Sequence, residues 1–338
     1  MKYAVVGFGT AGYHAVKKIR ELDKEGCIDV YSNTGRAPYN PMLTTYYAFG
    51  KLEYEGMFPF GDLEQIQKEV DFNLRKETVI KVHGSEHLVE TENGSEQYDR
   101  ILIATGARAF APPVKGLEPE DAFLMRTVED ALRFKDRLKK NDIKHAVVIG
   151  ASMAGIKVVE VLHKYGIETW LLDLASYIFP LAAYKEVAKE IEKRVEAQGV
   201  HLMFGVTIDH MEQENGEKTA VLTDGSRIPA DIVGLCIGTR AITETVQGEV
   251  EIGRGIVVDD HMRTSVPGIY AAGDCCEGNN LESGQNQIIG LWANANHQGE
   301  TAGINMAGGD MAYKGNILHN ITHFMNMDFI GFVGRQTK

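Results

Sequence analysis

Short apolar runs alternate with helical patterns along this chain of 338 residues. Two of the runs lead into glycine-rich turns and then into helical periodicity, which continues through Leu22 in the first case and to about Tyr165 in the second. Runs of this length predict buried strands, and their alternation with helices predicts an α/β fold. The predicted strands are residues 2–6, 28–31, 101–105, 146–149, 167–172 and 269–272, and a late helix is predicted at 293–307.

The first apolar run is followed by the turn Gly-Phe-Gly-Thr-Ala-Gly at residues 7–12. A strand, Gly-x-Gly-x-x-Gly and a helix in this order are typical of a site for a dinucleotide pyrophosphate. Gly7 would make the tight turn, Gly9 would let the backbone approach the phosphates, and Gly12 would let helix and strand pack closely. This pattern predicts a dinucleotide-binding domain at the start of the chain.

Such a domain usually has an acidic residue about 20 residues after the glycines, where it binds the adenosine ribose. Ser32 and Asn33 occupy that place, after the second predicted strand. Both side chains can hydrogen-bond a hydroxyl group, but neither supplies a carboxylate. We therefore expect this ribose contact to be weaker than the pattern implies.

A second turn of the same kind spans residues 150–155, with Ser152 in place of the middle glycine. Serine is small, so it hinders the approach of a phosphate without forbidding it. The next predicted strand ends at Asp173, where a ribose-binding carboxylate belongs. A carboxylate repels a 2′-phosphate, and no arginine occurs between Asp173 and Arg194 to clamp one. NADH is therefore favoured over NADPH.

The chain then repeats its own pattern. Residues 92–108 contain a turn, two strand-like runs and a glycine, and residues 223–240 contain the same features in the same order. Each copy follows its own glycine-rich turn. The repeat predicts two domains built on one plan.

A late apolar run stops at Gly273 and Asp274. A carboxylate at the C-terminal end of a buried strand lies where open α/β sheets bind their ligands. Residues 290–292 then open the predicted late helix, whose N-terminus carries about half a positive charge.

Together, the two glycine-rich turns and the late Gly273-Asp274 resemble the FAD-dependent pyridine nucleotide-disulfide oxidoreductase superfamily, most closely the NADH-oxidising flavin modules of nitrite and rubredoxin reductases. The resemblance implies two Rossmann-like three-layer domains of the glutathione reductase type, the second inserted in the first. It implies a FAD-binding domain at residues 1–111 and 244–315 and an NAD-binding domain at 112–243. Residues 316–338 would start a C-terminal interface segment with one or two strands within 317–333, which is short by nature, truncated or completed by a partner.

The resemblance also assigns residues to each cofactor. For FAD they are Gly7, Gly9, Thr10, Ala11, Gly12, Ser32, Asn33, Asn40, Thr105, Gly106, Gly273, Asp274, Leu291 and Trp292. For NAD they are Gly150, Ser152, Met153, Ala154, Gly155, Asp173 and Gly238.

Three of these assignments carry specific expectations. Asp274 would hold the ribityl chain of FAD, and Trp292 either walls the flavin ring or packs in the core. Lys157 stands where the family often has a glutamate directed at the nicotinamide, so it reverses the local charge. Trp292 and Lys157 are thus candidate modulators of the reaction, and no catalytic acid or base is identified.

Four cysteines, Cys27, Cys236, Cys275 and Cys276, lack the spacing that would hold zinc or an iron–sulfur cluster, so we expect no metal site. Pro41 stands about where the redox cysteine of related disulfide reductases falls. Disulfide exchange and sulfenic acid formation both need a thiolate. Cysteine chemistry is therefore disfavoured, and a disulfide reductase using Cys275 or Cys276 is kept only as a minor alternative.

The net charge of −12 disfavours nucleic acid as a partner. No apolar run reaches the roughly 18 residues of a membrane span, and the N-terminus lacks a signal-peptide pattern, so we expect a cytoplasmic protein. The resemblance implies an oxidoreductase that passes electrons from NADH via FAD to an external acceptor. An electron-carrier protein or a partner subunit is favoured, while quinone, oxygen and a homo-oligomeric state remain open. The alternative is a flavoprotein subunit or redox sensor with little independent turnover.

Overall fold

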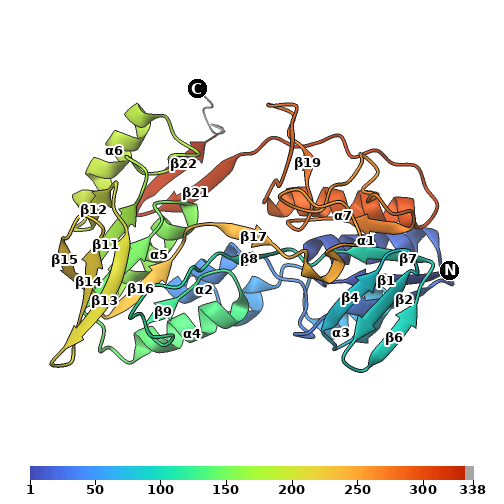
Figure 1. The fold of residues 1–338 in the computed structure, drawn as a ribbon, viewed down its shortest axis with the longest axis horizontal. Helices are drawn as coiled ribbons and strands as arrows, with labels where there is room; N and C mark the ends of the chain where they lie inside the picture. Colours follow the sequence, from blue (N-terminus) through green and yellow to red (C-terminus); the bar gives the residue numbers. More distant parts are fainter. Residues whose placement is uncertain (332–338) are drawn as a thin grey trace. The chain divides into compact units, whose positions relative to one another are not determined.

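The structure is a computed structural model that describes residues 1–331, and the predicted strand end at Val333 lies outside the described residues. The chain divides into two compact units. Unit 1 comprises residues 1–40, 58–108 and 240–318, and unit 2 comprises residues 41–57, 109–239 and 319–338. Figure 1 traces the chain by residue number.

Unit 1 is organised around a five-stranded parallel sheet in the order β18-β7-β1-β2-β3. Helices α1 and α7 pack against each other beside this sheet, and a three-stranded antiparallel sheet forms a further layer (Figure 1). Strands β1 and β7 are almost wholly buried, which explains why they are continuous apolar runs in the sequence. The elements are β1 (Lys2–Val6), α1 (Thr10–Leu22), β2 (Cys27–Tyr31), α3 (Leu63–Glu69), β3 (Asn73–Arg75), β4 (Val79–His83), β5 (Leu88–Thr91), β6 (Gly94–Gln97), β7 (Arg100–Ile103), η2 (Glu244–Val246), β18 (Ile269–Ala271), β19 (Gly278–Asn279), β20 (Asn286–Gln287) and α7 (Trp292–Met306).

Unit 2 repeats this plan. Its five-stranded parallel sheet has the order β12-β11-β10-β16-β9, and it too has a three-stranded antiparallel sheet. Its elements are α2 (Leu43–Phe49), η1 (Tyr54–Met57), β9 (Ala122–Phe123), α4 (Val128–Lys139), β10 (His145–Ile149), α5 (Met153–Lys164), β11 (Glu168–Asp173), α6 (Lys185–Glu196), β12 (His201–Phe204), β13 (Ile208–Glu214), β14 (Glu217–Leu222), β15 (Arg227–Pro229), β16 (Ile232–Leu235), β21 (Asn320–Phe324) and β22 (Met327–Gly331).

The two sheets correspond strand by strand. In each unit the strand before the glycine-rich turn, β1 or β10, lies in the middle of its sheet and pairs in parallel on both sides. The chain passes between the units through β8 (Ala107–Ala109) and β17 (Thr239–Ala241), which pair with each other. The prediction of two Rossmann-like domains, the second inserted in the first, is confirmed.

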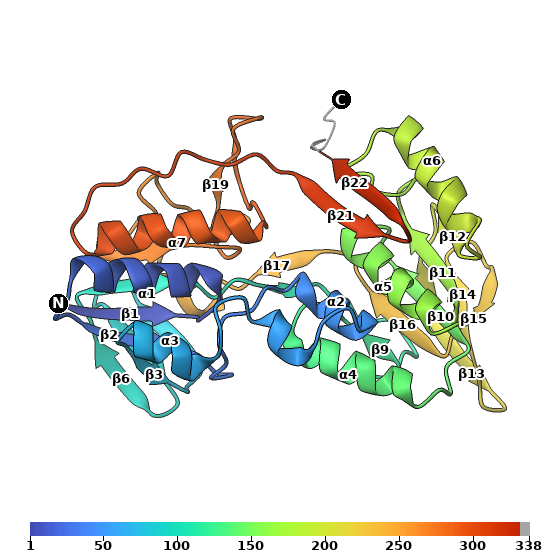
Figure 2. The same cartoon turned by 180° about the vertical axis from the view of Figure 1, so that it is seen from behind.

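Two segments group with unit 2 although they are distant from its main stretch in the sequence. Residues 41–57, which the sequence analysis places in the first domain, bring α2 against α4 and α5, and Ala48 is fully buried there (Figure 2). The β21–β22 hairpin buries Phe324 and Phe329 in the same core, where both rings contact Phe179. These groupings depend on packing partners more than 70 residues away, which no local pattern reveals.

Candidate functional site

The first glycine-rich turn is fixed by close backbone packing. Gly7 has a positive φ of 105°, and a Cβ atom there would overlap the carbonyl oxygen of Ala104. A Cβ on Gly12 would overlap the carbonyl oxygen of Gly7. At Gly9, by contrast, no atom of residues 1–331 beyond its immediate chain neighbours lies within 4 Å of the Cβ position. Close backbone packing thus requires glycine at positions 7 and 12, whereas Gly9 leaves open space at the turn.

Helix α1 begins at this turn without a side-chain cap. Its N-cap residue is Gly9, so the cap position of this helix in the described chain (residues 1–331) provides no side-chain acceptor for the first-turn amides. The Thr10 hydroxyl instead hydrogen-bonds the side chain of Asn296 on α7. Uncapped amides at a helix N-terminus suit an anion such as a pyrophosphate.

Helices α1 and α7 run side by side in the same direction. A Cβ on Gly299 would overlap the Ala11 carbonyl, and one on Gly303 would overlap the Ala15 carbonyl four residues further along. The small residues at these two positions let the backbones touch. The N-termini of both helices therefore lie at the same end of unit 1.

The strand end at Gly273 meets both helices at that end. A Cβ built on Gly273 would lie 3.1 Å from the Cβ of Ala11 on α1 and 3.7 Å from that of Ala295 on α7. The Gly273 amide donates to the buried Gln298 side chain at 2.9 Å. Asp274 follows directly and is half-buried. The predicted FAD residues of the first turn, β18 and α7 are thereby brought together.

Trp292 opens α7, which also lacks a side-chain cap. Its ring stacks on Phe60 with centroids 5.6 Å apart and an interplanar angle of 15°, and Phe60 stacks in turn on Tyr13 at 4.3 Å. The Trp292 indole N–H is buried and has no hydrogen-bond partner within residues 1–331. Such an orphaned donor is costly unless a ligand satisfies it. Together with the open Gly9 turn and the uncapped helices, it fits a bound flavin dinucleotide.

The second turn has the same backbone geometry but is less open. Cβ atoms on Gly150 and Gly155 would overlap the carbonyl oxygens of Cys236 and Gly150. The Ser152 hydroxyl accepts from the Gly155 amide at 3.3 Å and donates to the Cys236 carbonyl at 3.1 Å. One first-turn amide of α5 is thus already satisfied, so this turn offers an anion fewer free donors than the first.

Asp173 lies at the end of β11, beside this turn. One carboxylate oxygen accepts from the Ala151 amide at 2.7 Å, and the other accepts from the Ala175 amide at 2.8 Å. Each oxygen keeps a lone pair that could accept from a ribose hydroxyl. The side chain therefore braces the second turn in addition to its predicted role with NAD, a function that sequence spacing did not reveal.

Lys157 has other partners than the nicotinamide expected from its sequence position. Its ammonium group hydrogen-bonds Glu160 and donates to the His323 carbonyl at 2.7 Å, and it lies 4.5 Å from the ring centre of Tyr46. Burial lowers the pKa of Lys157, while its hydrogen bond to Glu160 opposes that shift. Glu160 also accepts from the Met325 amide at 3.1 Å. The pair therefore joins α5 to the β21–β22 hairpin.

All the predicted FAD residues lie in unit 1, and all the predicted NAD residues lie in unit 2. In unit 1, the Ser32 hydroxyl accepts from the Gly35 amide at 3.2 Å, and the Thr105 hydroxyl donates to the Ile242 carbonyl at 2.6 Å. Asn33 is exposed, while Asn40 is half-buried at the last position before the chain enters unit 2. Of the remaining residues, Gly106 and Gly238 have positive φ, Met153 and Leu291 are half-buried, and Ala154 is exposed.

A buried carboxylate that sequence reasoning missed lies on β2, three residues before Ser32. Asp29 is 1% exposed and accepts from the Tyr98 hydroxyl at 2.8 Å and the Asn73 amide at 3.0 Å. Burial and the hydrogen bonds with Tyr31 and Asp29 raise the pKa of Tyr98. An aspartate inside an apolar run gives no sequence signal of its partners, which come from β3 and from the segment between β6 and β7. The network stabilises the strand end near the predicted ribose contact.

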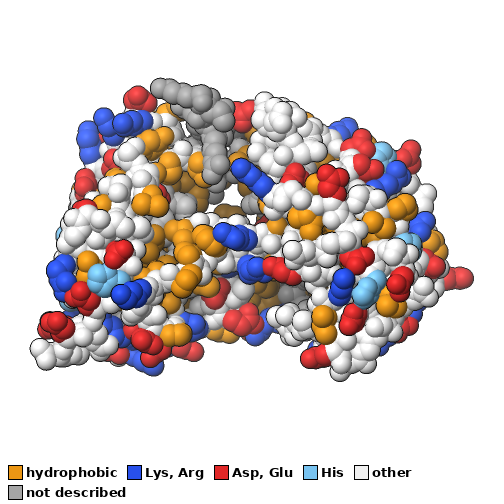
Figure 3. All heavy atoms as spheres, in the orientation of Figure 1, with side chains coloured by type: hydrophobic (Ala, Val, Ile, Leu, Met, Phe, Trp, Pro, Cys, Tyr) orange, Lys and Arg blue, Asp and Glu red, His pale blue; other side chains and the backbone are white. Residues whose placement is uncertain are grey.

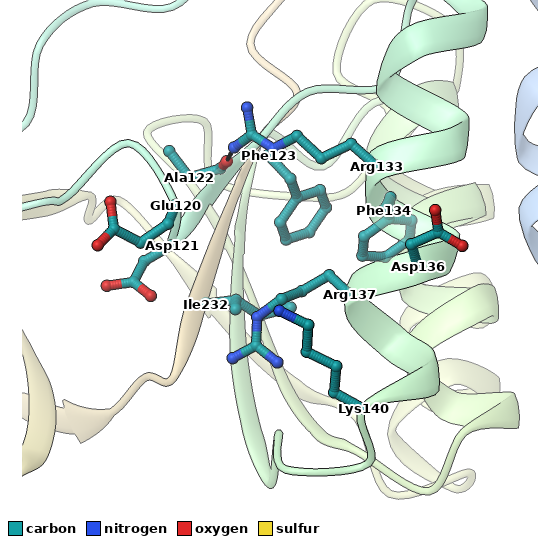
Figure 4. Close-up of a pocket in the computed structure, with 10 residues that line it drawn as sticks. All are labelled: Glu120, Asp121, Ala122, Phe123, Arg133, Phe134, Asp136, Arg137, Lys140 and Ile232. Carbon is teal, nitrogen blue, oxygen red and sulfur yellow. Dashed lines mark hydrogen bonds between the residues drawn. The ribbon is translucent and has the colours of Figure 1, made fainter.

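A pocket of about 360 Å³ lies elsewhere in unit 2, between α4, β9 and β16 (Figure 4). Phe123 and Phe134 stack at its wall with ring centroids 4.4 Å apart. Arg133 donates to the Pro119 carbonyl at 2.6 Å, and Asp121 is paired with Lys218 at the same distance. None of the predicted cofactor residues lines this pocket, so it is separate from both turns.

The chain matches the family described as "Pyridine nucleotide-disulphide oxidoreductase" over residues 1–299. It is 28% identical to the NADH-dependent phenylglyoxylate dehydrogenase subunit epsilon of Aromatoleum evansii, over 99% of this chain and 80% of that protein. It is also 28% identical to the 3-phenylpropionate/cinnamic acid dioxygenase ferredoxin–NAD(+) reductase component of Photorhabdus laumondii, over 90% of this chain and 77% of that protein.

Among solved structures, the NAD-dependent persulfide reductase from A. fulgidus is similar, with a TM-score of 0.90 and 26% identity over 96% of this chain. This chain spans 62% of that protein. Within residues 1–331, no helix is long and apolar enough to cross a membrane.

Proposed function

Because the chain belongs to the pyridine nucleotide-disulphide oxidoreductase family, we propose that it passes electrons from NADH through FAD to an electron-carrier protein or a partner subunit. The chain is an NADH-dependent flavin oxidoreductase, with FAD and NADH as its cofactors. The acceptor is the part that we propose. The similarity to the ferredoxin–NAD(+) reductase component supports a carrier protein.

One observation carries the assignment of cofactors to units. The turn of unit 1 is open at Gly9 and begins an uncapped helix, and it meets Asp274 and the orphaned Trp292 N–H at one end of the unit. We assign FAD to this site. The turn of unit 2 carries Asp173 at the adjoining strand end, and we assign NADH to it.

The protein's part in the reaction is to bind and orient. Bound FAD supplies the capacity to accept a hydride from NADH and to release the electrons afterwards. The first-turn amides of α1 would hold its pyrophosphate, and the N-terminus of α7 would favour negative charge near Trp292. Asp173 would accept from the ribose of NADH and disfavour a 2′-phosphate.

Thiol chemistry has little support in the geometry. Within the described part of the chain, Cys27 is exposed while the other three cysteines are buried, Cys275 and Cys276 to 0% and 1% exposure. Burial raises the pKa of Cys236 to about 12. Cysteines buried from solvent react poorly. This favours an external acceptor over a redox cysteine of the chain itself.

The acceptor is tested by measuring NADH oxidation under two conditions. An anaerobic assay contains an acidic [2Fe–2S] ferredoxin, and a parallel assay in air contains none. We expect the ferredoxin rate to exceed the rate in air. If air alone supports the faster rate, oxygen replaces the carrier as acceptor. If the reduced flavin persists in both assays, the protein acts as a sensor or requires a dedicated partner subunit.

A further inference from the structure

Helix α2 carries aromatic rings whose faces are covered by lysines from neighbouring elements of unit 2. The Nζ atom of Lys135 on α4 lies 3.8 Å from the ring centre of Tyr47. Lys164 at the end of α5 lies 4.5 Å from the ring centre of Phe49, and Lys51 lies 4.3 Å from the same ring. Figure 2 shows α2 lying against α4 and α5. We call Lys51, Lys135 and Lys164 the lysine surface.

The lysine surface is held in place by the residues beneath it. Lys164 donates to the Phe49 carbonyl, so its ammonium group is tied to the end of α2. Lys51 lies 3.3 Å from the buried Glu160, which also pairs with Lys157 under the Tyr46 ring. Because these side chains are already ordered, a partner that binds them loses less conformational entropy on association.

The lysine surface is a local group of positive charges on a chain whose net charge is negative. Within residues 1–331, neither Lys135 nor Lys164 has a carboxylate at ion-pair distance, whereas Lys139 pairs with Asp136 at 2.8 Å. Residues 133–140, at the end of α4 and just beyond it, hold five basic side chains and one acidic side chain, although the chain as a whole has a net charge of −12. Three of the five, Arg133, Arg137 and Lys140, line the pocket of Figure 4. Figure 3 shows Lys and Arg side chains interspersed with Asp and Glu side chains over the face that it draws.

We propose that the lysine surface docks an acidic electron-carrier protein, an inference that rests on the proposed function. An acidic carrier would be repelled by the net charge of this chain, so association needs a local patch of the opposite sign. Complementary charge steers encounter and raises the association rate more than it raises final affinity. Lysine stems often cover aromatic rings for packing alone, which is the competing explanation to be tested.

The test compares two double variants with the same net charge. Lys135→Glu/Lys164→Glu reverses the lysine surface, and Lys185→Glu/Lys189→Glu reverses two exposed lysines of α6 in the same unit. Lys135→Met/Lys164→Met keeps the stems over the rings and removes only the charges. Each protein is assayed with NADH and an acidic [2Fe–2S] ferredoxin over a range of salt concentrations. A parallel assay uses the small dye dichlorophenolindophenol as acceptor.

We expect kcat/KM for ferredoxin at low salt to fall about tenfold in the lysine-surface reversal. The Met variant should lose less but show a flatter salt dependence, while the α6 control and all dye rates stay near wild type. Wild-type ferredoxin kinetics in the reversal variant would overturn the docking inference alone. An equal loss with the dye would show that these lysines act on folding or flavin turnover, which also overturns it. A wild-type protein that reduces the dye but no acidic ferredoxin would overturn the carrier protein as acceptor, and the docking inference with it.

Discussion

The glycines of the first turn have different roles, and alanine substitutions distinguish a role in FAD binding from a role in stability. Gly9 has a φ of −80° and open space at its Cβ position, so Gly9→Ala should fold normally yet lose affinity for FAD, because a methyl group then stands where the pyrophosphate would approach. Gly12→Ala should instead destabilise the protein by about 1–3 kcal/mol, because its methyl group meets the Gly7 carbonyl.

Flavin content after purification and the thermal midpoint distinguish these two effects. A glycine elsewhere in the chain is not a better control for adding a methyl group. Gly199 has a positive φ, which an alanine would strain, and Gly290, which has an ordinary φ and open space, adjoins the assigned FAD site. The better comparison is between Gly9→Ala and Gly12→Ala themselves. A Gly9→Ala protein with full flavin content would show that the pyrophosphate lies elsewhere.

Ser152 limits how openly the second turn can receive a phosphate. Ser152→Gly removes the hydroxyl that occupies the Gly155 amide, and exchanging such a capping serine for glycine costs only a few tenths of a kcal/mol. We therefore expect NADH to bind more tightly to Ser152→Gly, by several-fold, measured by calorimetry on the flavin-loaded protein. Weaker binding of NADH would mean that the hydroxyl itself contacts the cofactor.

His14 on α1 should make stability depend on pH. Burial lowers the pKa of His14 below its ordinary value of 6.5 more than the nearby Glu300 raises it. The unfolded chain then binds a proton at this site more readily than the folded chain does. The corresponding stability is present above about pH 6.5 and is lost as the pH falls.

The variant His14→Gln isolates this contribution. Free energies of unfolding are measured between pH 5 and pH 8 for both proteins, in a range where we expect the wild type to lose more stability than the variant on acidification. Contributions that the two proteins share cancel in the comparison. Parallel curves would show that His14 has the same pKa in the folded and unfolded chains.

At the scale of secondary structure elements, the Lys157–Glu160 pair attaches the β21–β22 hairpin to α5. Glu160→Gln leaves the buried Lys157 ammonium without its counter-charge, and breaking a buried pair from one side costs about 3–5 kcal/mol. The double variant Lys157→Met/Glu160→Gln should recover much of this loss. The Met325 amide donates a hydrogen bond to Glu160, and its hydrogen exchange should speed up in both Glu160→Gln and the double variant.

Urea unfolding of Glu160→Gln, of Lys157→Met and of the double variant completes this cycle. Additive losses would mean that the two side chains do not interact, and the hairpin would then be held by its other contacts, among them the packing of Phe324 and Phe329 on Phe179. Glu21→Gln is a suitable control, because it removes an exposed partner of Lys18 on α1 and should cost less than about 1 kcal/mol.

Elements that follow from local patterns could be predicted from the sequence, and those that depend on distant packing could not. Strand β1 and helix α1 were predicted to the residue or nearly so, because an apolar run and a glycine turn mark their ends. The place of α2 beside α5 could not be predicted, since Ala48 and Tyr46 carry no signal of their partners more than 100 residues later. The hydrogen bond from the Ala151 amide of the second turn to Asp173 likewise could not be predicted, because the sequence position indicated only a contact with ribose.

At the scale of the whole molecule, the repeated order of turn, strand and glycine predicted two domains on one plan, and the matching sheets confirm it. The assignment of FAD to unit 1 and NADH to unit 2 remains a proposal, since it depends on which turn is open. The sequence predicted that Ser152 hinders a phosphate at the second turn, but its capping bonds, which occupy an amide of α5, are visible only in three dimensions.

If the cysteines only fill space, the whole molecule should work without the adjacent pair. Cys275→Ala/Cys276→Ala removes two buried thiols that donate to nearby carbonyl oxygens. We expect some loss of thermal stability but an unchanged rate of flavin reduction by NADH. A variant that folds and binds FAD yet is not reduced by NADH would revive thiol chemistry at this strand end.

The most direct test of the central claim is an anaerobic titration of the purified protein with NADH and, separately, with NADPH, following the visible flavin band. The account predicts that NADH bleaches the band at low concentration and that NADPH requires far more. A flavin that neither coenzyme reduces would contradict the oxidoreductase function, and a colourless protein that cannot take up FAD would contradict the assignment of the open turn at Gly9.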